Sequence, residues 1–497
     1  MMKKAKKIVA AMMALVLTFA MGITVFAAPK GTFDVTIKDA DKGHTYEAYQ
    51  VFSGELSEDG KKLSNIKWGE GISEEGQKAL GDATEYANKL AGEGVSAEAE
   101  AAVIGTYLTS PTASVSESAE SDGKYTYVIK DLPAGYYLIK DADNSLNGSE
   151  SAYTSYILQV VKDVEVEPKA DVASVTKFVK DANDSTGETT DWQKSADYDA
   201  GDSVPFRLVA TMPSNIDDYE TYKLVFHDTL SAGLTYTDAD AFTVNIGDAV
   251  VEGFTKTVTV NDDGTTSVDF ACDDIKALGS VTAGTTVAIE YSAVLNENSV
   301  IGAQGNPNEV YLEFSNDPNK SGKGENTPTG TTPKDQAVVF TYKVVINKVD
   351  QDSKPLAGAE FTLYKMVNGV KTAVTTTTVS EDGTTFEFLR LDDGEYVLEE
   401  TKTPDGYNSI PEVAFTVVAD HGTTLDALTG TQTSEGTTLV RFAENLAEGA
   451  LATDVMNASG ATLPSTGGAG TVAIYTIGII LVLGAAIFLI TKKRVNK

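Results

Sequence analysis

Apolar and polar residues alternate in short runs through most of the chain between residues 28 and 458, and Gly, Asp, Asn and Thr separate the runs. Clear examples are residues 33–37, 126–129 and 343–346. An alternation with a period of two places successive side chains on opposite faces of an extended strand. The pattern therefore predicts an all-β protein built from antiparallel sandwiches.

Two local signals refine this picture. Asp-Gly pairs predict hairpin turns at residues 263–264, 382–383 and 393–394, because glycine accepts a positive φ. Residues 74–107 are instead rich in Ala, Glu, Leu and Lys, and Ser73 stands where an N-cap is expected. We expect a helical insertion there, inside the first domain.

The N-terminal end has the pattern of a secretory signal peptide. Lysines at positions 3, 4, 6 and 7 precede an apolar run over residues 8–26 and two small residues, Ala27 and Ala28. Val25 and Ala27 provide the small side chains that signal peptidase requires, so cleavage is predicted after Ala27. The mature protein is expected to be secreted.

The C-terminal end has a second apolar stretch, residues 469–491, that is long enough to cross a bilayer. Lys492, Lys493, Arg494 and Lys497 follow it and are expected to keep this end in the cytoplasm. We therefore predict a C-terminal transmembrane helix.

A chain of 497 residues is longer than one hydrophobic core usually serves, which favours three domains between the two ends. One boundary is expected near Pro168-Lys169-Ala170, and another within the polar stretch at residues 317–335. The predicted parts are a signal peptide at 1–27, an N-terminal domain at 28–170, a middle domain at 171–335, a C-terminal domain at 336–458 and an anchoring region at 459–497.

Composition excludes several classes of function. The net charge of −33 disfavours a nucleic-acid partner. The single cysteine, Cys272, rules out an internal disulfide, so another feature must stabilise an exported protein of this size. No nucleophile elbow, phosphate loop or dinucleotide motif occurs, and we predict neither enzymatic activity towards other molecules nor a cofactor.

No metal site is predicted either. His44, His227 and His421 lie far apart without metal-ligand spacing and are expected to be surface or strand residues. The acidic loop at residues 181–184 lacks a full EF-hand pattern, although calcium binding by such a loop stays open.

A sorting motif precedes the C-terminal apolar stretch. The pentapeptide Leu463-Pro464-Ser465-Thr466-Gly467, followed by an apolar span and a basic tail, resembles the cell-wall sorting signal of sortase substrates. In that family a sortase thiol attacks the threonine carbonyl, and an amine then resolves the thioester. The resemblance implies cleavage between Thr466 and Gly467, after a transient stay in the membrane, and attachment to peptidoglycan.

A candidate acceptor lysine lies at the first domain boundary. Residues 164–169 resemble the shaft-pilin motif W-x-x-x-V-x-V-Y-P-K of Gram-positive pilins. Val164, Val166, Pro168 and Lys169 match, whereas Val160 and Glu167 replace the tryptophan and the tyrosine. The resemblance implies that Lys169 accepts Thr466 of a neighbouring subunit. Proline stiffens the end of the preceding strand, although an interdomain linker with a solvated lysine is the alternative.

The third domain resembles the collagen-adhesin B-type domain, an Ig-like β-sandwich, in its opening residues 347–361. Residues 396–407 also match the E-box Y-x-L-x-E-T-x-A-P-x-G-Y of that family, with Thr403 in place of alanine. The resemblance implies an isopeptide bond between Lys348 and Asn457, with Glu400 as the catalytic acid. Burial would favour a neutral amine facing a protonated acid. A simple ion pair between Lys348 and Glu400 is the alternative.

The middle domain shows a looser resemblance to the middle domain of pilins, in residues 174–177, 227–234 and 308–318. It implies Lys177 as the amine, Asp228 as the acid and Asn308 as the amide of a second isopeptide bond. Asn316 shares a strand face with Asn308 and stays the alternative. In the first domain, residues 135–141 are similar to an E-box without its glutamate, so no isopeptide bond is predicted there.

Taken together, these resemblances imply tandem collagen-adhesin-type sandwiches of a backbone pilin, polymerised by sortase through Thr466 and Lys169. The implied partners are sortase, identical subunits, accessory pilins and peptidoglycan, and binding of a host ligand stays open. A monomeric wall-anchored adhesin or an ancillary pilin is the alternative.

Overall fold

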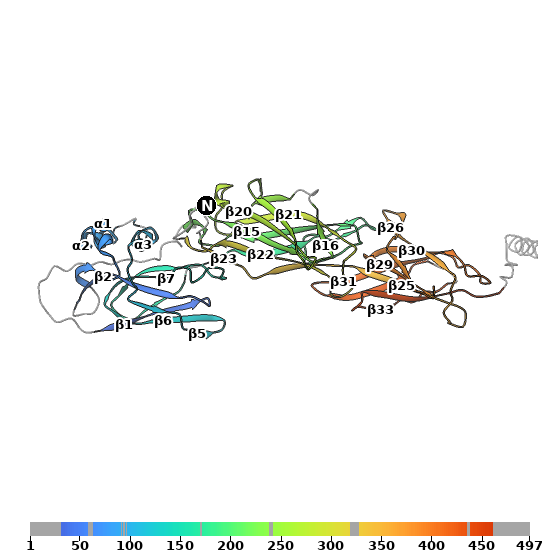
Figure 1. Cartoon of the computed structure of the whole chain (residues 1–497), viewed down its shortest axis with the longest axis horizontal. Coiled ribbons are helices and arrows are strands. Elements are labelled where there is room, and N and C mark those ends of the chain that lie inside the picture. The colour runs from blue at the N-terminus through green and yellow to red at the C-terminus, as the bar shows by residue number, and fades with distance from the viewer. Residues whose placement is uncertain are drawn as a thin grey trace, which may run out of the picture. The chain divides into compact units, whose positions relative to one another are not determined.

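The computed structural model describes residues 31–460, apart from residues 58–62, 91, 93–94, 96, 169–170, 238–241, 319–327 and 435–437. The described residues form two compact units. One unit holds the first and middle sandwiches and the segment Asp420–Asp426, and the other holds the third sandwich and the segment Asp184–Thr186. Figure 1 shows the strands and helices of each part.

The first sandwich has one sheet in the order β5-β6-β1-β9 and another in the order β3-β2-β7-β8, with β4 paired to β2. Its elements are β1 Thr32–Ala40, β2 Tyr46–Leu56, β3 Leu63–Trp68, α1 Glu74–Leu80, α2 Ala83–Leu90, α3 Ala97–Gly105, β4 Ala113–Val115, β5 Ser118–Ser121, β6 Lys124–Pro133, β7 Gly135–Asp141, β8 Ser155–Val160 and β9 Val164–Val166.

The alternation in β7 explains the layers of this sandwich. Tyr137 and Ile139 pack between the two sheets, whereas Tyr136 and Leu138 pack on the opposite face. Side chains from α2 and α3 cover that second face, and the three helices lie together beside β2 and β7 (Figure 1). Ser73 caps α1 by accepting a hydrogen bond from the Gly76 N–H, so the predicted helical insertion and its N-cap are confirmed.

The middle sandwich has sheets in the orders β10-β14-β21-β17-β18 and β13-β24-β22-β15-β20-β19, with β16 paired to β21 and β23 paired to β22. Its strands are β10 Ser174–Val179, β11 Ala182–Asn183, β12 Glu188–Thr189, β13 Ser195–Asp197, β14 Ser203–Thr211, β15 Leu224–Leu230, β16 Leu234–Tyr236, β17 Thr243–Ile246, β18 Ala249–Val251, β19 Thr255–Val260, β20 Thr266–Cys272, β21 Thr286–Leu295, β22 Asn306–Ser315, β23 Thr329–Thr331 and β24 Asp335–Phe340, with short 3₁₀ turns at Ile216–Asp218 and Ile275–Ala277. One continuous core, which includes Phe206, Phe226 and Tyr291, fills the space between the sheets.

The third sandwich has sheets in the orders β28-β29-β25-β34-β33 and β27-β26-β30-β31-β32. Its strands are β25 Tyr342–Val349, β26 Glu360–Val367, β27 Val370–Ala373, β28 Thr377–Val379, β29 Thr385–Leu391, β30 Gly394–Lys402, β31 Val413–His421, β32 Leu425–Gln432, β33 Ala443–Asn445 and β34 Ala450–Met456. The first and last strands, β25 and β34, are parallel neighbours, and Lys348 pairs with Val455.

The all-β prediction is confirmed, and so are two of the three predicted hairpin turns. Gly264 and Gly383 have φ values of +84° and +68° and connect the paired strands β19–β20 and β28–β29. The prediction at residues 393–394 is wrong. Gly394 does have a positive φ of +143°, but β29 and β30 lie in different sheets, so this turn crosses between sheets.

Several predicted features lie outside the described residues. These are the signal peptide at 1–27, Lys169, the sorting motif at 463–467 and the apolar stretch at 469–491. Among the helices that are described, none is long and apolar enough to cross a membrane.

Candidate functional site

Lys177 is buried in the centre of the middle sandwich, with 0% of its surface exposed. It lies on β10, and its strand position faces the opposite sheet, which contributes Asp228 from β15 and Asn308 from β22. Asp228 and Asn308 are also buried, with 1% and 0% of their surfaces exposed. The structure therefore brings together the predicted amine, acid and amide.

A fourth residue, Tyr291 on β21, joins these three. The Lys177 ammonium contacts one carboxylate oxygen of Asp228, and the Tyr291 hydroxyl donates to the other. Tyr291 also lies 3.3 Å from Lys177 Nζ, and it accepts a hydrogen bond of 2.7 Å from Asn308 Nδ2. Sequence reasoning missed Tyr291 because nothing in the pattern of β21 distinguishes it from other core aromatic residues.

Burial also shifts the pKa values of Lys177 and Asp228. It lowers the pKa of Lys177 to about 8 against the opposing charge of Asp228, and it raises the pKa of Asp228. Both shifts favour the uncharged amine and the uncharged acid. The Oδ1 atom of Asn308 is buried and finds no hydrogen-bond donor among the described residues. An unpartnered buried amide oxygen is uncommon in folded proteins and distinguishes this amide from an ordinary core asparagine.

Asn316, the alternative amide, makes its hydrogen bonds to residues outside this buried group. Its Nδ2 donates to the backbone carbonyls of Leu146 and Ser151 at 2.9 and 3.1 Å, and its backbone carbonyl accepts from the Tyr153 N–H at 2.7 Å. These partners belong to a loop of the first sandwich. Asn316 therefore contributes to the contact between the first and middle sandwiches, and the geometry favours Asn308 as the amide.

In the third sandwich, Lys348 and Asn457 come from the neighbouring segments β25 and the end of β34. Lys348 is 1% exposed and Asn457 is 0% exposed. Lys348 Nζ donates to the Val455 carbonyl at 2.9 Å, and the Asn457 N–H donates to the Val349 carbonyl at 3.0 Å. Burial lowers the pKa of Lys348 to about 8, although the charge of Glu400 acts in the opposite direction.

Glu400 on β30 holds the amide of this pair. Asn457 Nδ2 donates to both carboxylate oxygens of Glu400, at 2.8 and 3.1 Å. Thr403, the departure from the E-box pattern, donates its hydroxyl to the same carboxylate at 2.9 Å. No ion pair joins Lys348 to Glu400 in the described part of the chain, so the contacts do not favour the simple ion-pair alternative.

The first sandwich has a different buried pair. His44 Nδ1 lies 2.8 Å from Asp141, and both side chains are almost fully buried. The Thr154 N–H and hydroxyl also donate to Asp141. The expectation that His44 is a surface or strand residue is wrong, since its side chain is buried although it lies in the loop between β1 and β2. An imidazole thus accompanies the acid here, in place of the lysine of the other two sandwiches.

The predicted acceptor segment is held on both sides. β9 pairs in parallel with β1 up to Val166, and Lys38 and Glu165 form an ion pair of 2.6 Å. After the two undescribed residues, Asp171 accepts hydrogen bonds from the N–H groups of Val172 and Ser214. Lys169 itself lies outside the described residues, but its flanking segments are tied to the first and middle sandwiches.

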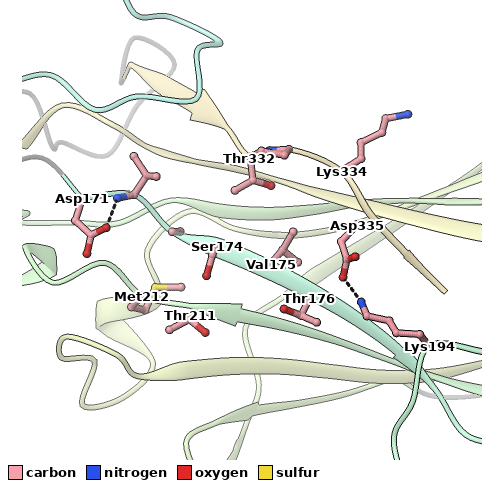
Figure 2. Close-up of a pocket in the computed structure, with 13 residues that line it drawn as sticks. Asp171, Ser174, Val175, Thr176, Lys194, Thr211, Met212, Thr332, Lys334 and Asp335 are labelled. Carbon is pink, nitrogen blue, oxygen red and sulfur yellow. Dashed lines mark hydrogen bonds and ion pairs between the residues drawn. The ribbon is translucent and has the colours of Figure 1, made fainter. Parts of the chain in front are cut away.

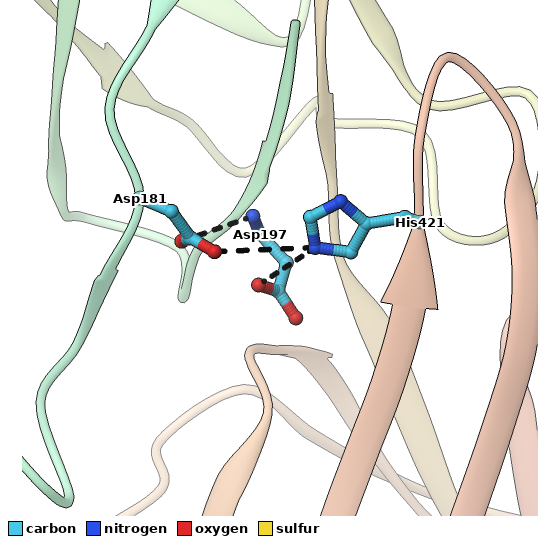
Figure 3. A group of neighbouring side chains, drawn as sticks. All are labelled: Asp181, Asp197 and His421. Carbon is cyan, nitrogen blue, oxygen red and sulfur yellow. Dashed lines mark hydrogen bonds and ion pairs between the residues drawn. The ribbon is translucent and has the colours of Figure 1, made fainter. Parts of the chain in front are cut away.

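Asp181, Asp197 and His421 form one further cluster (Figure 3). His421 Nε2 lies 3.3 Å from Asp197 and 4.0 Å from Asp181, while Nδ1 lies 2.9 Å from the Ser195 hydroxyl. These side chains are of the types that can hold a divalent metal, but the observed distances also suit hydrogen bonds and ion pairs around one imidazole. Sequence spacing could not reveal the cluster, because His421 is 224 residues from Asp197.

Comparisons with known proteins agree with this geometry. Residues 200–318 match the family model described as Gram-positive pilin backbone subunit 2, Cna-B-like domain. Residues 342–433 match a prealbumin-like fold domain, and residues 456–497 match the LPXTG cell wall anchor motif.

Whole-chain comparisons extend these matches. The chain is 26% identical over 399 residues to the trypsin-resistant surface T6 protein of Streptococcus pyogenes serotype M6, covering 66% of this chain and 70% of that protein. The solved T6 backbone pilin matches with a TM-score of 0.55 and 17% identity, over 88% of this chain and all of that chain. The full-length major pilin SpaD of Corynebacterium diphtheriae matches with a TM-score of 0.51 and 19% identity, over 87% and 98% of the two chains. The two structural likenesses show the same fold.

The sandwiches and the family matches together define a structural protein of the Gram-positive backbone pilin class rather than an enzyme class. The LPXTG anchor motif indicates how this pilin is attached to the cell. The chain is a backbone pilin that is anchored to the cell wall as part of a surface pilus.

Proposed function

We propose that this pilin polymerises covalently, with Thr466 of one subunit joined to the side-chain amine of Lys169 in the next. The proposal is supported by the position of Lys169 between two tethered segments, just after the proline that follows β9. Sortase supplies the thioester at Thr466, and the lysine amine resolves it. The last subunit is attached to peptidoglycan through the same chemistry, and accessory pilins join the fibre through sortase.

We also propose that the middle and third sandwiches each form an internal isopeptide bond, Lys177–Asn308 and Lys348–Asn457. The observation that carries this proposal is a buried lysine beside a buried asparagine and an acid in both sandwiches. Nothing outside the chain is needed, because the amine, the amide and the proton carrier are its own side chains.

In the middle sandwich the neutral Lys177 amine attacks Cγ of Asn308, and the new Nζ–Cγ bond replaces the Cγ–Nδ2 bond. One amine proton moves to Nδ2, which leaves as ammonia. Asp228 contacts the amine, and Tyr291 lies between Asp228 and Nδ2, so these two residues are placed to carry that proton. In the third sandwich Glu400 contacts the leaving nitrogen directly.

Tandem mass spectrometry of pili released from the cell wall tests the polymer. We expect a branched peptide in which the Thr466 carbonyl is linked to Lys169 Nζ. Material that contains only single chains ending in peptidoglycan, with Lys169 unmodified, would show that the protein is a monomeric wall-anchored adhesin instead.

The choice between Asn308 and Asn316 gives a separate prediction for the middle sandwich. The Asn308→Ala chain should retain the mass of one ammonia that the wild type loses, because the leaving group is gone. The matched Asn316→Ala chain should still lose it, since Asn316 contacts the first sandwich. Intact mass spectrometry measures both, and the reverse result would move the bond to Asn316.

A further inference from the structure

A groove of about 680 Å³ runs along the start of β10 in the middle sandwich (Figure 2). Its walls come from residues 171–176, 211–212 and 332–335 and from Lys194. Lys194 and Asp335 neutralise one another as an ion pair of 2.5 Å. The Asp171 carboxylate is occupied by the backbone N–H groups of Val172 and Ser214. Lys334, the other charged residue of the lining, forms an ion pair of 2.8 Å with Glu309. The groove is therefore suited to an uncharged chain.

The open edge of β10 borders this groove. β10 pairs with β14 on one side only among the described strands. On the other side, the Lys177 N–H donates to Asp335 at 2.6 Å, and Val179 exchanges two backbone hydrogen bonds with Gln193. Backbone direction alternates along an antiparallel strand, so the N–H and C=O of Val175 also point away from β14. No described residue bonds these two groups, which leaves an edge that can accept an added strand.

The proposed Lys169–Thr466 linkage places the C-terminal segment of a neighbouring copy close to the open edge of β10. Lys169 is two residues before Asp171, so its Cα lies within about 7 Å of the end of the groove. Six uncharged residues, Ala461–Thr466, follow the last described residue and end at the proposed linkage. The tail must reach from Lys169 to Val175, which are six residues apart and therefore at most about 20 Å from one another. The Lys169 side chain together with six extended residues, which alone span about 20 Å, covers that distance.

We propose that the groove binds Ala461–Thr466 of the neighbouring copy, which adds to the edge of β10 as a short extended strand after Thr466 is joined to Lys169. This inference rests on the proposed function. Pro464 has no N–H and is tolerated where its nitrogen faces outward. Leu463 or Ser465, one residue to either side, therefore pairs with Val175.

Hydrogen exchange in a linked dimer tests the added strand. Two full mature chains are joined by sortase, and the exchange of individual amides is compared with the monomer. The Val175 amide should exchange at least about ten-fold more slowly in the dimer, since it gains a backbone acceptor. The Val179 amide should not change, because it already donates to Gln193.

The two proposals fail in different ways in this experiment. If the Lys169–Thr466 peptide is present and the Val175 amide exchanges as in the monomer, the docked tail is wrong and the polymer stands. If the linked peptide does not form, both proposals are wrong.

A cysteine pair gives a second readout. The dimer formed from a Ser465→Cys donor and a Ser174→Cys acceptor should form an intersubunit disulfide, since Ser174 is an exposed residue lining the groove. A Thr257→Cys acceptor is the control, because Thr257 is exposed on β19 of the other sheet. Equal disulfide yields from the two acceptors would contradict docking in the groove.

Discussion

Cells that express the Lys169→Ala pilin are expected to lose the ladder of high-molecular-weight species that survives boiling in detergent. Only single wall-attached chains should remain. The reason is chemical, because resolution of the sortase thioester into a polymer needs a nucleophilic amine at that position. Immunoblots of cell-wall extracts measure the change, which should be a complete loss of the polymer.

Two variants make this result specific. Lys169→Arg retains the positive charge but replaces the amine with a guanidinium that is always protonated, and it should abolish the ladder equally. Lys162→Ala removes an exposed lysine near the same domain boundary and should leave the ladder intact. A ladder that persists in Lys169→Ala cells and disappears in Lys162→Ala cells would assign the linkage to the other lysine.

The Glu400→Ala chain is expected to lack the isopeptide bond of the third sandwich. Its intact mass should exceed that of the cross-linked form by one ammonia, after correction for the substitution itself, because Glu400 is the acid that contacts the leaving nitrogen. The bond closes a loop of roughly 110 residues. By the loop-entropy model its absence costs about 4–5 kcal/mol, so the melting temperature of this domain should fall by the order of 20 °C.

Glu399→Ala is the matched control for this experiment. Glu399 is the adjacent residue on β30, and its side chain points to the opposite face from Glu400. This variant should keep both the ammonia loss and nearly all of the thermal stability. If calorimetry and intact mass show the same values for Glu400→Ala as for Glu399→Ala, the role assigned to Glu400 is wrong.

The period-two pattern was sufficient to predict the class of fold. It places buried and exposed residues in alternation, and Ser73 marked the start of the helical insertion in the first sandwich. The same local signal failed at Asp393-Gly394, because an Asp-Gly pair specifies a backbone conformation and carries no information about which sheet receives the next strand. Pairing partners are decided by tertiary packing.

Some residues of the candidate sites could likewise be predicted from the sequence, and others could not. Lys348, Glu400 and Asn457 could be proposed from a long motif, and the structure places Asn457 against Glu400 as that motif implies. Tyr291 and the environment of His421 could not be proposed, since each depends on contacts between strands far apart in the sequence. His44 shows the same limit, because its burial depends on Asp141, 97 residues away.

The parallel pairing of β25 and β34 has a mechanical consequence. Because these strands run in the same direction, the chain enters the third sandwich at one end of the pair and leaves it at the other. A pull on the two ends would therefore load the hydrogen bonds from Lys343 to Val349 in shear, all at once, and would not open them one after another. The strand order alone thus gives this domain resistance to stretching by fluid flow, before any covalent bond is considered.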